Sequence, residues 1–265
     1  MSWSGSDASD RADRRRLVSL AAALLLVATG LVAGAANTIV GSGSLATFPA
    51  LLAIGLTPVP ANATNTVGLV LGSVSGVIGY RRELVGQADR VRRLAPAAVV
   101  GGVAGAALLL VLPATVFRVV VPVLIGLAVV LVVVQPRLAR RLRRPGRVRP
   151  GGRGLPAGVL GTAVYGGYFG AAQGVILLAL LGSTLDDTTQ RLNGLKNVLA
   201  GLVNVAAALV FIAAARVEWA PAGVLAGSTA VGAQLGALVG RRLSPTVLRV
   251  AMVTAGLAAI ARLVA

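Results

Sequence analysis

Residues 41–49 have the sequence Gly-Ser-Gly-Ser-Leu-Ala-Thr-Phe-Pro and lie in a long uncharged part of the chain. Two glycines, two serines and a proline favour an interrupted helix. Glycine costs about 1 kcal/mol in a helix interior relative to alanine, and proline removes a backbone hydrogen bond. The segments on either side, 17–40 and 62–80, are apolar and contain no charged residue. The stretch therefore places irregular backbone between two segments that have the composition of membrane helices.

The composition of the whole chain supports this interpretation. Hydrophobic residues make up 56% of the sequence and charged residues 12%, against about 25% charged in an ordinary soluble domain. A helix needs about 20 apolar residues to cross the hydrocarbon layer. Apolar runs of roughly this length or longer recur at 17–40, 62–80, 94–117, 119–136, 154–185, 197–215, 219–240 and 243–264. We predict an all-α polytopic membrane protein with about eight transmembrane helices.

The net charge of +17 comes from arginines that are clustered in short loops. One cluster occupies 81–93, and eight arginines lie between positions 137 and 153. Short basic loops remain on the cytoplasmic side, so we expect both clusters and both termini to be cytoplasmic in a multi-pass plasma membrane protein. The loops are placed to contact lipid headgroups, whereas a nucleic-acid partner would favour a basic face on a soluble domain. A cleaved signal peptide competes for 17–40, but this run is longer than a typical signal sequence.

This orientation restricts the segment 41–60. If 17–40 runs outward and 62–80 delivers Arg81 and Arg82 to the inside, the segment between them must begin and end outside. It should dip into the membrane and return, or break the ends of the two flanking helices. Irregular backbone at membrane depth is tolerated only where protein or a water-filled cavity satisfies its polar groups. We therefore expect this segment to line a cavity.

The sequence also contains an internal repeat. The segment "LPATVFRV" at 112–119 resembles "LSPTVLRV" at 243–250, and Gly43 matches Gly170 at an offset of 127. Asn65 matches Asn197 at an offset of 132. These matches divide the chain into a cytoplasmic tail (1–16), a first transmembrane repeat (17–135), a basic cytoplasmic linker (136–153) and a second repeat (154–265). Four spans in each half favour halves of parallel orientation, while an odd number of spans would make them inverted.

The second half has its own interrupted segment, "GGYFGAAQG" at 166–174, followed by "NGLKN" at 193–197. Together with "GSGSLATFPALLAIGLTPVPANATNT", "GYRRELVGQAD" and "VEWAPAGVLAGSTAVGAQLGALVGRRL", these segments make the chain resemble the TauE/SafE family, also called toluene sulfonate uptake permeases, over roughly residues 20 to 262. The resemblance implies a secondary transporter of sulfite, sulfonates or related organosulfur anions. It places the substrate-binding glycine-rich turns and helix openings at Gly41, Gly43, Pro49, Gly167, Gly170, Gly174, Asn62, Asn65, Lys196 and Asn197.

The residues themselves are compatible with an anion. Lys196 is the only lysine of the sequence and lies in an apolar run, where a charge is expensive and suggests function. It could equally extend to the interface or pair with Asp186 or Asp187. Hydroxyl and amide groups that could donate to an oxyanion, or alternatively cap helices, belong to Ser42, Ser44, Gln173, Asn62, Asn65, Asn193 and Asn197.

Other functions find less support. The sequence has no histidine or cysteine, which disfavours a histidine-dependent protease and a site for nickel or cobalt. It has no P-loop or dinucleotide-binding motif, so we expect no enzyme activity, no cofactor and no metal. We predict a secondary transporter of small anions that works by alternating access. The alternatives are a passive channel, a structural membrane protein, or a transporter of an unrelated substrate such as a metal cation. The sequence is compatible with a homo-oligomer and with a monomer.

Overall fold

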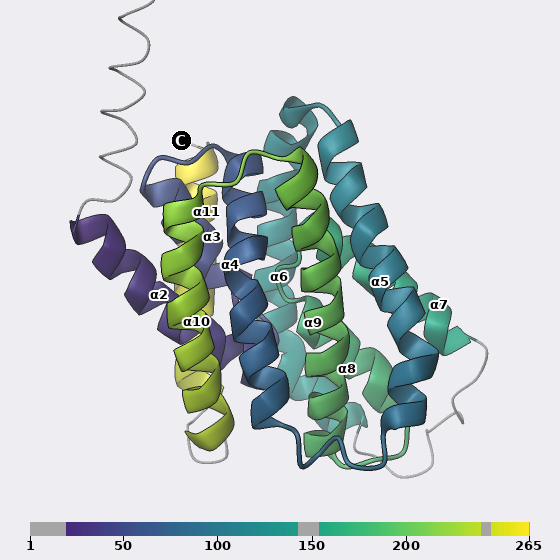
Figure 1. Cartoon of the computed structure of the whole chain (residues 1–265). Coiled ribbons are helices and arrows are strands. Elements are labelled where there is room, and N and C mark those ends of the chain that lie inside the picture. Colours follow the sequence, from purple (N-terminus) through teal and green to yellow (C-terminus); the bar gives the residue numbers. More distant parts are fainter. Residues whose placement is uncertain (1–19, 143–153, 240–244, 265) are drawn as a thin grey trace, which may run out of the picture.

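A computed structural model describes residues 20–142, 154–239 and 245–264. These residues form ten α-helices (Figure 1) and, within those ranges, no β-strand. The prediction of an all-α chain is therefore confirmed for the described residues. The helices are α2 (Leu20–Ile39), α3 (Ser44–Ala53), α4 (Pro58–Gly79), α5 (Ala88–Val111), α6 (Ala114–Leu142), α7 (Gly154–Tyr168), α8 (Gln173–Thr184), α9 (Thr189–Ala214), α10 (Trp219–Val239) and α11 (Pro245–Val264).

Four helical segments are long and apolar enough to cross a membrane by length and composition: Leu20–Ile39, Ala88–Val111, Ala114–Arg137 and Thr189–Ala214. The predicted layout of eight spanning helices is not confirmed. The run 154–185 is not one helix but two short ones, α7 and α8. The run 17–40 corresponds to α2, which turns back through the short helix α3: Gly43 lies against Ala33 and Asn37 of α2. Each half therefore begins with a hairpin of helices.

The order of helices in the first half recurs in the second. Pro58, Ala88 and Ala114 begin α4, α5 and α6, and the residues 131 positions later begin α9, α10 and α11. This spacing pairs Asn62 with Asn193 and Asn65 with Lys196. The predicted pairing of Asn65 with Asn197 is therefore wrong by one residue. The domain boundaries that we derived from the repeat stay a prediction.

The two halves run in opposite directions. Ser73 of α4 accepts a hydrogen bond from Asn204 of α9, while Val77 lies next to Gly201, so α4 and α9 are antiparallel. In contrast, α4 and α10 are parallel, because Thr229 bonds to Gly68 and Gln234 bonds to Ser75. The predicted parallel arrangement of the halves is thus wrong. A hairpin returns to the end where it started, so each half crosses the bundle with three helices, an odd number that inverts the next half.

The basic connection between α4 and α5 lies at the opposite end of the bundle from Leu20 and Val264 (Figure 1). The two ends of the chain, 1–19 and 265, lie outside the described residues, so the cytoplasmic position of both termini stays a prediction. α2 runs parallel to α10, since Gly232 and Gly236 face Leu31 and Ala35. Gly79 meets Ala237 near the basic end, so α10 finishes at that end.

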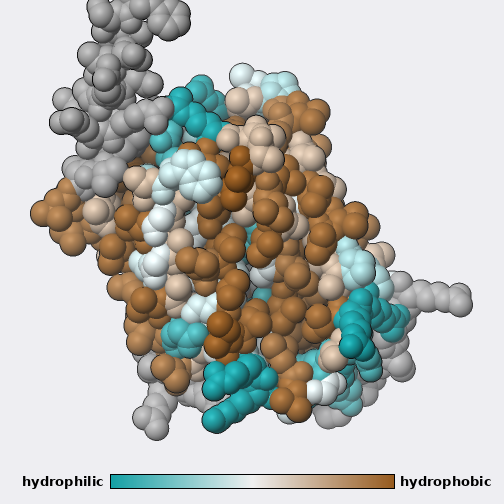
Figure 2. Space-filling model, in the orientation of Figure 1, coloured by the Kyte–Doolittle hydropathy of each residue, from teal (hydrophilic) through white to brown (hydrophobic). Residues whose placement is uncertain are grey.

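The hydropathy of the surface differs between the middle of the bundle and the ends of its helices. On the face seen in Figure 2, hydrophobic residues cover the middle of the bundle and hydrophilic residues gather towards its two ends. Many large hydrophobic side chains are exposed, among them Leu24, Leu71, Val130 and Leu235. Such a belt is what a membrane protein presents to lipid, because lipid tails impose no cost on exposed apolar side chains.

Candidate functional site

The two interrupted segments predicted from the sequence form turns with the same hydrogen bonds. At the end of α2, the N–H groups of Val40 and Gly41 both donate to the carbonyl of Ala36, at 2.7 and 2.8 Å. At the end of α7, Phe169 and Gly170 both donate to Tyr165, at 3.0 and 3.2 Å. Gly41 and Gly170 have φ angles of 88° and 76°, a left-handed conformation that favours glycine.

The turns meet in the interior of the bundle. The N–H group of Gly174 donates to the carbonyl of Gly41 over 3.0 Å. A Cβ atom on Gly174 would lie 2.5 Å from the Cα atom of Gly41, so the contact leaves no room for a side chain. This hydrogen bond joins the first half directly to the second.

Two asparagines at equivalent positions hold the opposite hairpins. Asn62 of α4 donates through Nδ2 to the carbonyl of Tyr168, at the end of α7, over 3.0 Å. Asn193 of α9 donates through Nδ2 to Thr38, in the last turn of α2, over 3.1 Å. Both side chains are buried. Because the last carbonyls of a helix have no partner within it, these amides satisfy the broken ends of α2 and α7.

One turn further along each helix the equivalence fails. Asn65 donates to the hydroxyl of Ser44 and accepts a hydrogen bond from the hydroxyl of Thr47, both on α3. At the equivalent position, Lys196 is fully buried, and its Nζ donates to the carbonyls of Asn37 and Thr38 over 3.0 and 3.2 Å. The predicted pairing of Lys196 with Asp186 or Asp187 is not found. The lysine instead places a positive charge at the C-terminal end of α2.

The helices that leave the turns have open N-termini. Neither α3 nor α8 has a side-chain cap. The backbone N–H groups of Ser42, Gly43 and Ser44 have no acceptor in the described part of the chain. Since the negative ends of α2 and α7 are covered by donors, the uncompensated partial charge near the turns is positive, which favours anions.

Four buried side-chain atoms near the turns have no hydrogen-bond partner within the part of the chain that the structure describes: Ser42 Oγ, Gln173 Nε2, Asn62 Oδ1 and Asn193 Oδ1. Ser42 and Gln173 each adjoin one of the contacting glycines in sequence, and the two asparagines bond to the ends of α7 and α2. All four residues were predicted site residues. Buried polar groups are nearly always hydrogen-bonded, so this cluster indicates a place where a ligand or water completes the bonding.

The structure brings most of the predicted residues together but not all. Asn197 joins the site, because its Nδ2 donates to Thr38 over 3.4 Å. Gly167 instead packs against Gly102 of α5. Pro49 lies in the middle of α3 and lines a separate cavity with Leu25 and Ala255. These two positions serve helix packing and not the turns.

The sequence analysis missed two residues that support the first turn. Thr47 bonds to Asn65, and Gln135 of α6 donates to the carbonyl of Val40 and accepts a hydrogen bond from Arg249. Thr47 lies in the segment 41–49, three residues after Ser44, and Gln135 is the one amide in the run 119–136. An isolated polar residue in an apolar run was the available signal for Gln135, and closeness to the two serines was the signal for Thr47.

Aromatic side chains hold the turns and their neighbours in place. Phe48 of α3 contacts Phe169 edge to face, with ring centres 5.3 Å apart. Phe117 of α6 contacts Tyr168 and Phe169 at 5.6 and 6.2 Å. Phe48 and Phe117 belong to the first half, while Tyr168 and Phe169 belong to the second. This cluster therefore fixes the position of one hairpin against the other half.

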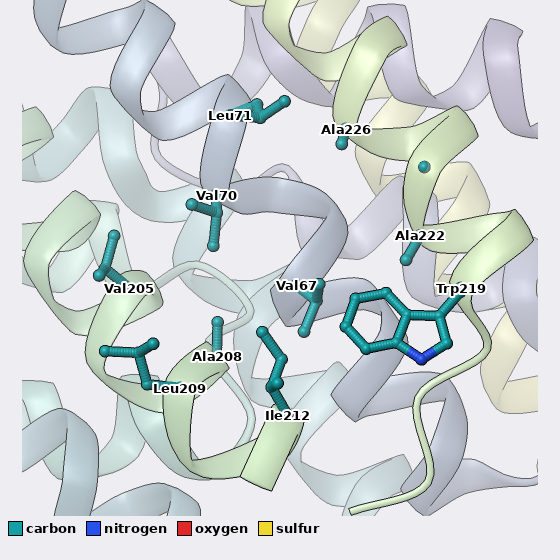
Figure 3. A pocket seen from close by; sticks show the side chains of 11 residues that line it. Val67, Val70, Leu71, Val205, Ala208, Leu209, Ile212, Trp219, Ala222 and Ala226 are labelled. Carbon is teal, nitrogen blue, oxygen red and sulfur yellow. The ribbon is translucent and has the colours of Figure 1, made fainter.

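A cavity of about 300 Å³ lies apart from these turns, between α4, α9 and α10 (Figure 3). Its lining is apolar, and the indole of Trp219 stands at one side, near Val67 and Ile212. The indole N–H of Trp219 is the one side-chain donor among these lining residues, and a surface with so few polar groups cannot compensate an anion that has lost its water. We therefore place the candidate site at the polar turns and not in this cavity.

At the basic end, an ionic cluster joins the two halves. Asp187, between α8 and α9, accepts hydrogen bonds from Arg90 of α5 and from Arg191 of α9. Arg191 also donates to the carbonyl of Val85, and Gln87 donates to the carbonyl of Arg191. Burial raises the pKa of Asp187, but hydrogen bonds from Arg90, the Thr188 backbone and Arg191 outweigh it, so that the pKa is lowered overall. We call Arg90, Asp187 and Arg191 the ionic clasp.

The described residues contain no group of three or more metal-ligating His, Cys, Asp or Glu side chains. What the fold and site define is a helical membrane protein of two inverted halves, each opening with a broken helix whose turn meets the other inside the bundle. Comparison with known sequences gives the family. The model of the sulfite exporter TauE/SafE family matches residues 26–263, and the chain belongs to this family of membrane transporters.

Relatives with a curated description agree with this assignment. The chain is 30% identical over 230 residues to the probable membrane transporter protein YfcA of Escherichia coli strain K12, covering 83% of this chain and 79% of the relative. The YfcA proteins of E. coli O6:H1 and O157:H7 match to the same extent. No solved structure matches. The family is one of transporters and not of enzymes.

Proposed function

We propose that this protein is a secondary transporter of small anions, with sulfite or an organosulfonate as its substrate. The observation that carries the proposal is the meeting of two broken helices at Gly41 and Gly174, beside uncapped helix N-termini and unpartnered buried polar atoms. Broken helices at equivalent places in inverted halves form the substrate sites of many transporters. The family name supplies sulfite as the first substrate to test.

The proposed site consists of the residues of the two turns and the amides that surround them. Donors come from the N–H groups of 42–44, the hydroxyl of Ser42, the amide of Gln173 and the ammonium of Lys196. Gly41, Gly43, Gly170 and Gly174 shape the turns, while Asn62, Asn65, Asn193 and Asn197 hold the helix ends around them. Ser44 orients Asn65 through its hydroxyl.

The inverted halves give a physical basis for alternating access. If the end with the basic loops is cytoplasmic, the hairpin α2–α3 enters from outside and α7–α8 enters from the cytoplasm. Rocking one half against the other would open the turns to each side in succession. The ionic clasp ties the α4–α5 connection to the start of α9, so in this scheme it would have to break when the cytoplasmic end opens. In this orientation both ends of the described chain lie outside.

Uptake of radiolabelled sulfite into proteoliposomes tests the proposal. We expect saturable uptake that is accelerated by sulfite on the opposite side, since a carrier exchanges its substrate. Lys196→Asn, which copies the residue type of the equivalent Asn65, should reduce uptake by at least about tenfold, the effect of losing about 1.4 kcal/mol of binding. Arg82→Gln removes one exposed positive charge outside the site and serves as the matched control.

Other outcomes would assign a different function. A leak that never saturates would indicate a passive channel, and uptake of a divalent metal in place of sulfite would indicate a cation transporter. Either result would contradict the proposed anion carrier while leaving the fold unchanged.

A further inference from the structure

The charge balance of the site limits the charge of its ligand. Lys196 is 0% exposed, and its ammonium bonds to two carbonyl oxygens and to no carboxylate. Among the described helices, Asp89 in the first turn of α5 is the one acidic residue, and its side chain is 99% exposed. Asp187 is occupied by the ionic clasp, and Glu218 by Arg216. Glu83 and Asp186 lie in connections between helices, and Glu83 packs beside Gly194 of α9. Among the described residues, the contacts of the Lys196 ammonium are to the carbonyls of Asn37 and Thr38 and to no carboxylate, so no ion pair balances its charge directly.

The ammonium of Lys196 also retains bonding capacity. A lysine ammonium carries three N–H donors, and two of them are used by the carbonyls of Asn37 and Thr38. A buried charge without a partner is unfavourable, so one negative charge bound at the third donor completes the site. A second negative charge would find no second buried cation there, and its desolvation would go uncompensated.

The hydrogen-bond inventory adds a second restriction. Asn193 and Lys196 donate to the same carbonyl oxygen, that of Thr38, at 3.1 and 3.2 Å. The other end of the Asn193 amide, Oδ1, is a buried acceptor without a donor. An anion that only accepts hydrogen bonds would satisfy Lys196 but leave Asn193 Oδ1 unpaired. The free energy lost when this oxygen was removed from water would then not be recovered. An anion that carries an N–H or O–H group can satisfy both.

We infer that the site takes a singly charged oxyanion that bears a hydrogen-bond donor, with Lys196 as its countercharge and Asn193 Oδ1 as its acceptor. Hydrogen sulfite, sulfamate and hydroxy-substituted sulfonates belong to this class, while sulfate and doubly ionised sulfite do not. The inference rests on the proposed function and names the substrate class of the same site. It explains why one half carries a lysine where the other carries Asn65.

A comparison of three small anions tests the single charge and the hydrogen-bond donor separately. Sulfamate and methanesulfonate have the same shape and single charge, but sulfamate carries an amino group where methanesulfonate carries a methyl group. Sulfate has a similar size and two negative charges. The measurement is competition of each anion with sulfite uptake in proteoliposomes, accompanied by thermal stabilisation of the purified protein. We expect sulfamate to act at a concentration at least about tenfold lower than methanesulfonate, and sulfate to have the weakest effect.

Two variants assign the effects to residues. Lys196→Asn should weaken competition by sulfamate and methanesulfonate alike, because it removes the charge that both need, whereas Arg82→Gln should change neither. Asn193→Ala should reduce the preference for sulfamate over methanesulfonate towards unity. If Asn193→Ala does not fold, the ratio of the two anions on the unaltered protein still decides the matter.

Several results would overturn the inference. Equal competition by sulfamate and methanesulfonate would contradict the requirement for a hydrogen-bond donor on the ligand. Competition by sulfate as strong as that by sulfamate would contradict the requirement for a single negative charge. In both cases saturable sulfite uptake would persist, so the proposed function would stand. If sulfite uptake itself does not saturate and no anion stabilises the protein, the proposed function and the inference fail together.

Discussion

Gly41 and Gly174 join the two halves of the molecule through backbone atoms alone. Their hydrogen bond and close approach leave no room for a Cβ atom. Glycine is therefore required at position 174 because the backbone of Gly41 lies so close, and not because of the backbone conformation of residue 174 itself. Gly41 meets both requirements, because its φ of 88° is also left-handed. The same two residues control the distance between the N-termini of α3 and α8.

A methyl group at position 174 should test this contact. Gly174→Ala forces the turns apart, and overpacking of this kind costs about 1 to 3 kcal/mol. We expect a lower melting temperature in detergent and loss of sulfite uptake. Gly161→Ala is the matched control, because a Cβ atom there meets nothing within 4 Å, and alanine favours a helix by up to about 1 kcal/mol. A variant at 174 as stable and active as the control would refute the contact.

The sequence predicted many of the individual residues of the candidate site, but few of the hydrogen bonds that these residues form. Serine, glutamine and asparagine next to the glycine turns and at the openings of the following helices were the signal that predicted Ser42, Gln173, Asn62 and Asn193. The sequence did not predict that Lys196 bonds to the carbonyls of α2, since this depends on which helix end faces α9. Pro49 and Gly167 were included by resemblance and belong to packing, a distinction that only the neighbours of each residue can make.

In the proposed mechanism, the hairpins and the connections between helices are the segments that move relative to one another. The ionic clasp joins the α4–α5 connection to the start of α9, and it must break if the basic end of the bundle is to open. The side chain of Asp187 is 12% exposed, while Arg90 and Arg191 are about one-third exposed at 32% and 33%. Solvent therefore weakens the pairing, and we expect the clasp to contribute about 1 kcal/mol.

The stabilisation from the clasp should depend on pH. The pKa of Asp187 is lowered in the folded protein, so its contribution is present above the unfolded value of about 3.9 and is lost as the pH falls through the lower folded value. We expect Asp187→Asn to melt at a lower temperature than the unaltered protein at pH 5 to 8. The difference should shrink towards zero below about pH 4. A constant difference across that range would mean that the carboxylate charge is not what stabilises the clasp.

On the scale of the whole molecule, the sequence predicted helices and two similar halves but not their relative direction. The reason lies in α2. A helix of 20 apolar residues has the length of a full span, whether it crosses the membrane or turns back within it. Counting it as a crossing gave four spans in each half and parallel halves. The turn at Gly41 makes α2 and α3 a hairpin, and the remaining three helices invert the second half.

The basic connection between α4 and α5 predicts which end of the bundle faces the cytoplasm. The chain contains no cysteine, so single cysteines can be introduced without removing others. Val85, in the basic connection, is 72% exposed, and Val111, at the opposite end of α5, is 81% exposed. In intact cells, a membrane-impermeant thiol reagent should label Val111→Cys, and should label Val85→Cys only after permeabilisation. The reverse pattern would contradict the orientation and leave the fold intact.

The proposed transport function depends most on whether the turns between the broken helices hold the substrate. Ser42 is 1% exposed and its hydroxyl has no partner, so a cysteine there reports directly on the site. The measurement is the rate at which a small thiol reagent modifies Ser42→Cys in proteoliposomes with and without sulfite, with the exposed Ser183→Cys as control. We predict that sulfite slows modification at 42 by at least about tenfold and leaves 183 unchanged. Equal rates at 42 with and without sulfite, in a variant that still transports it, would contradict the claim.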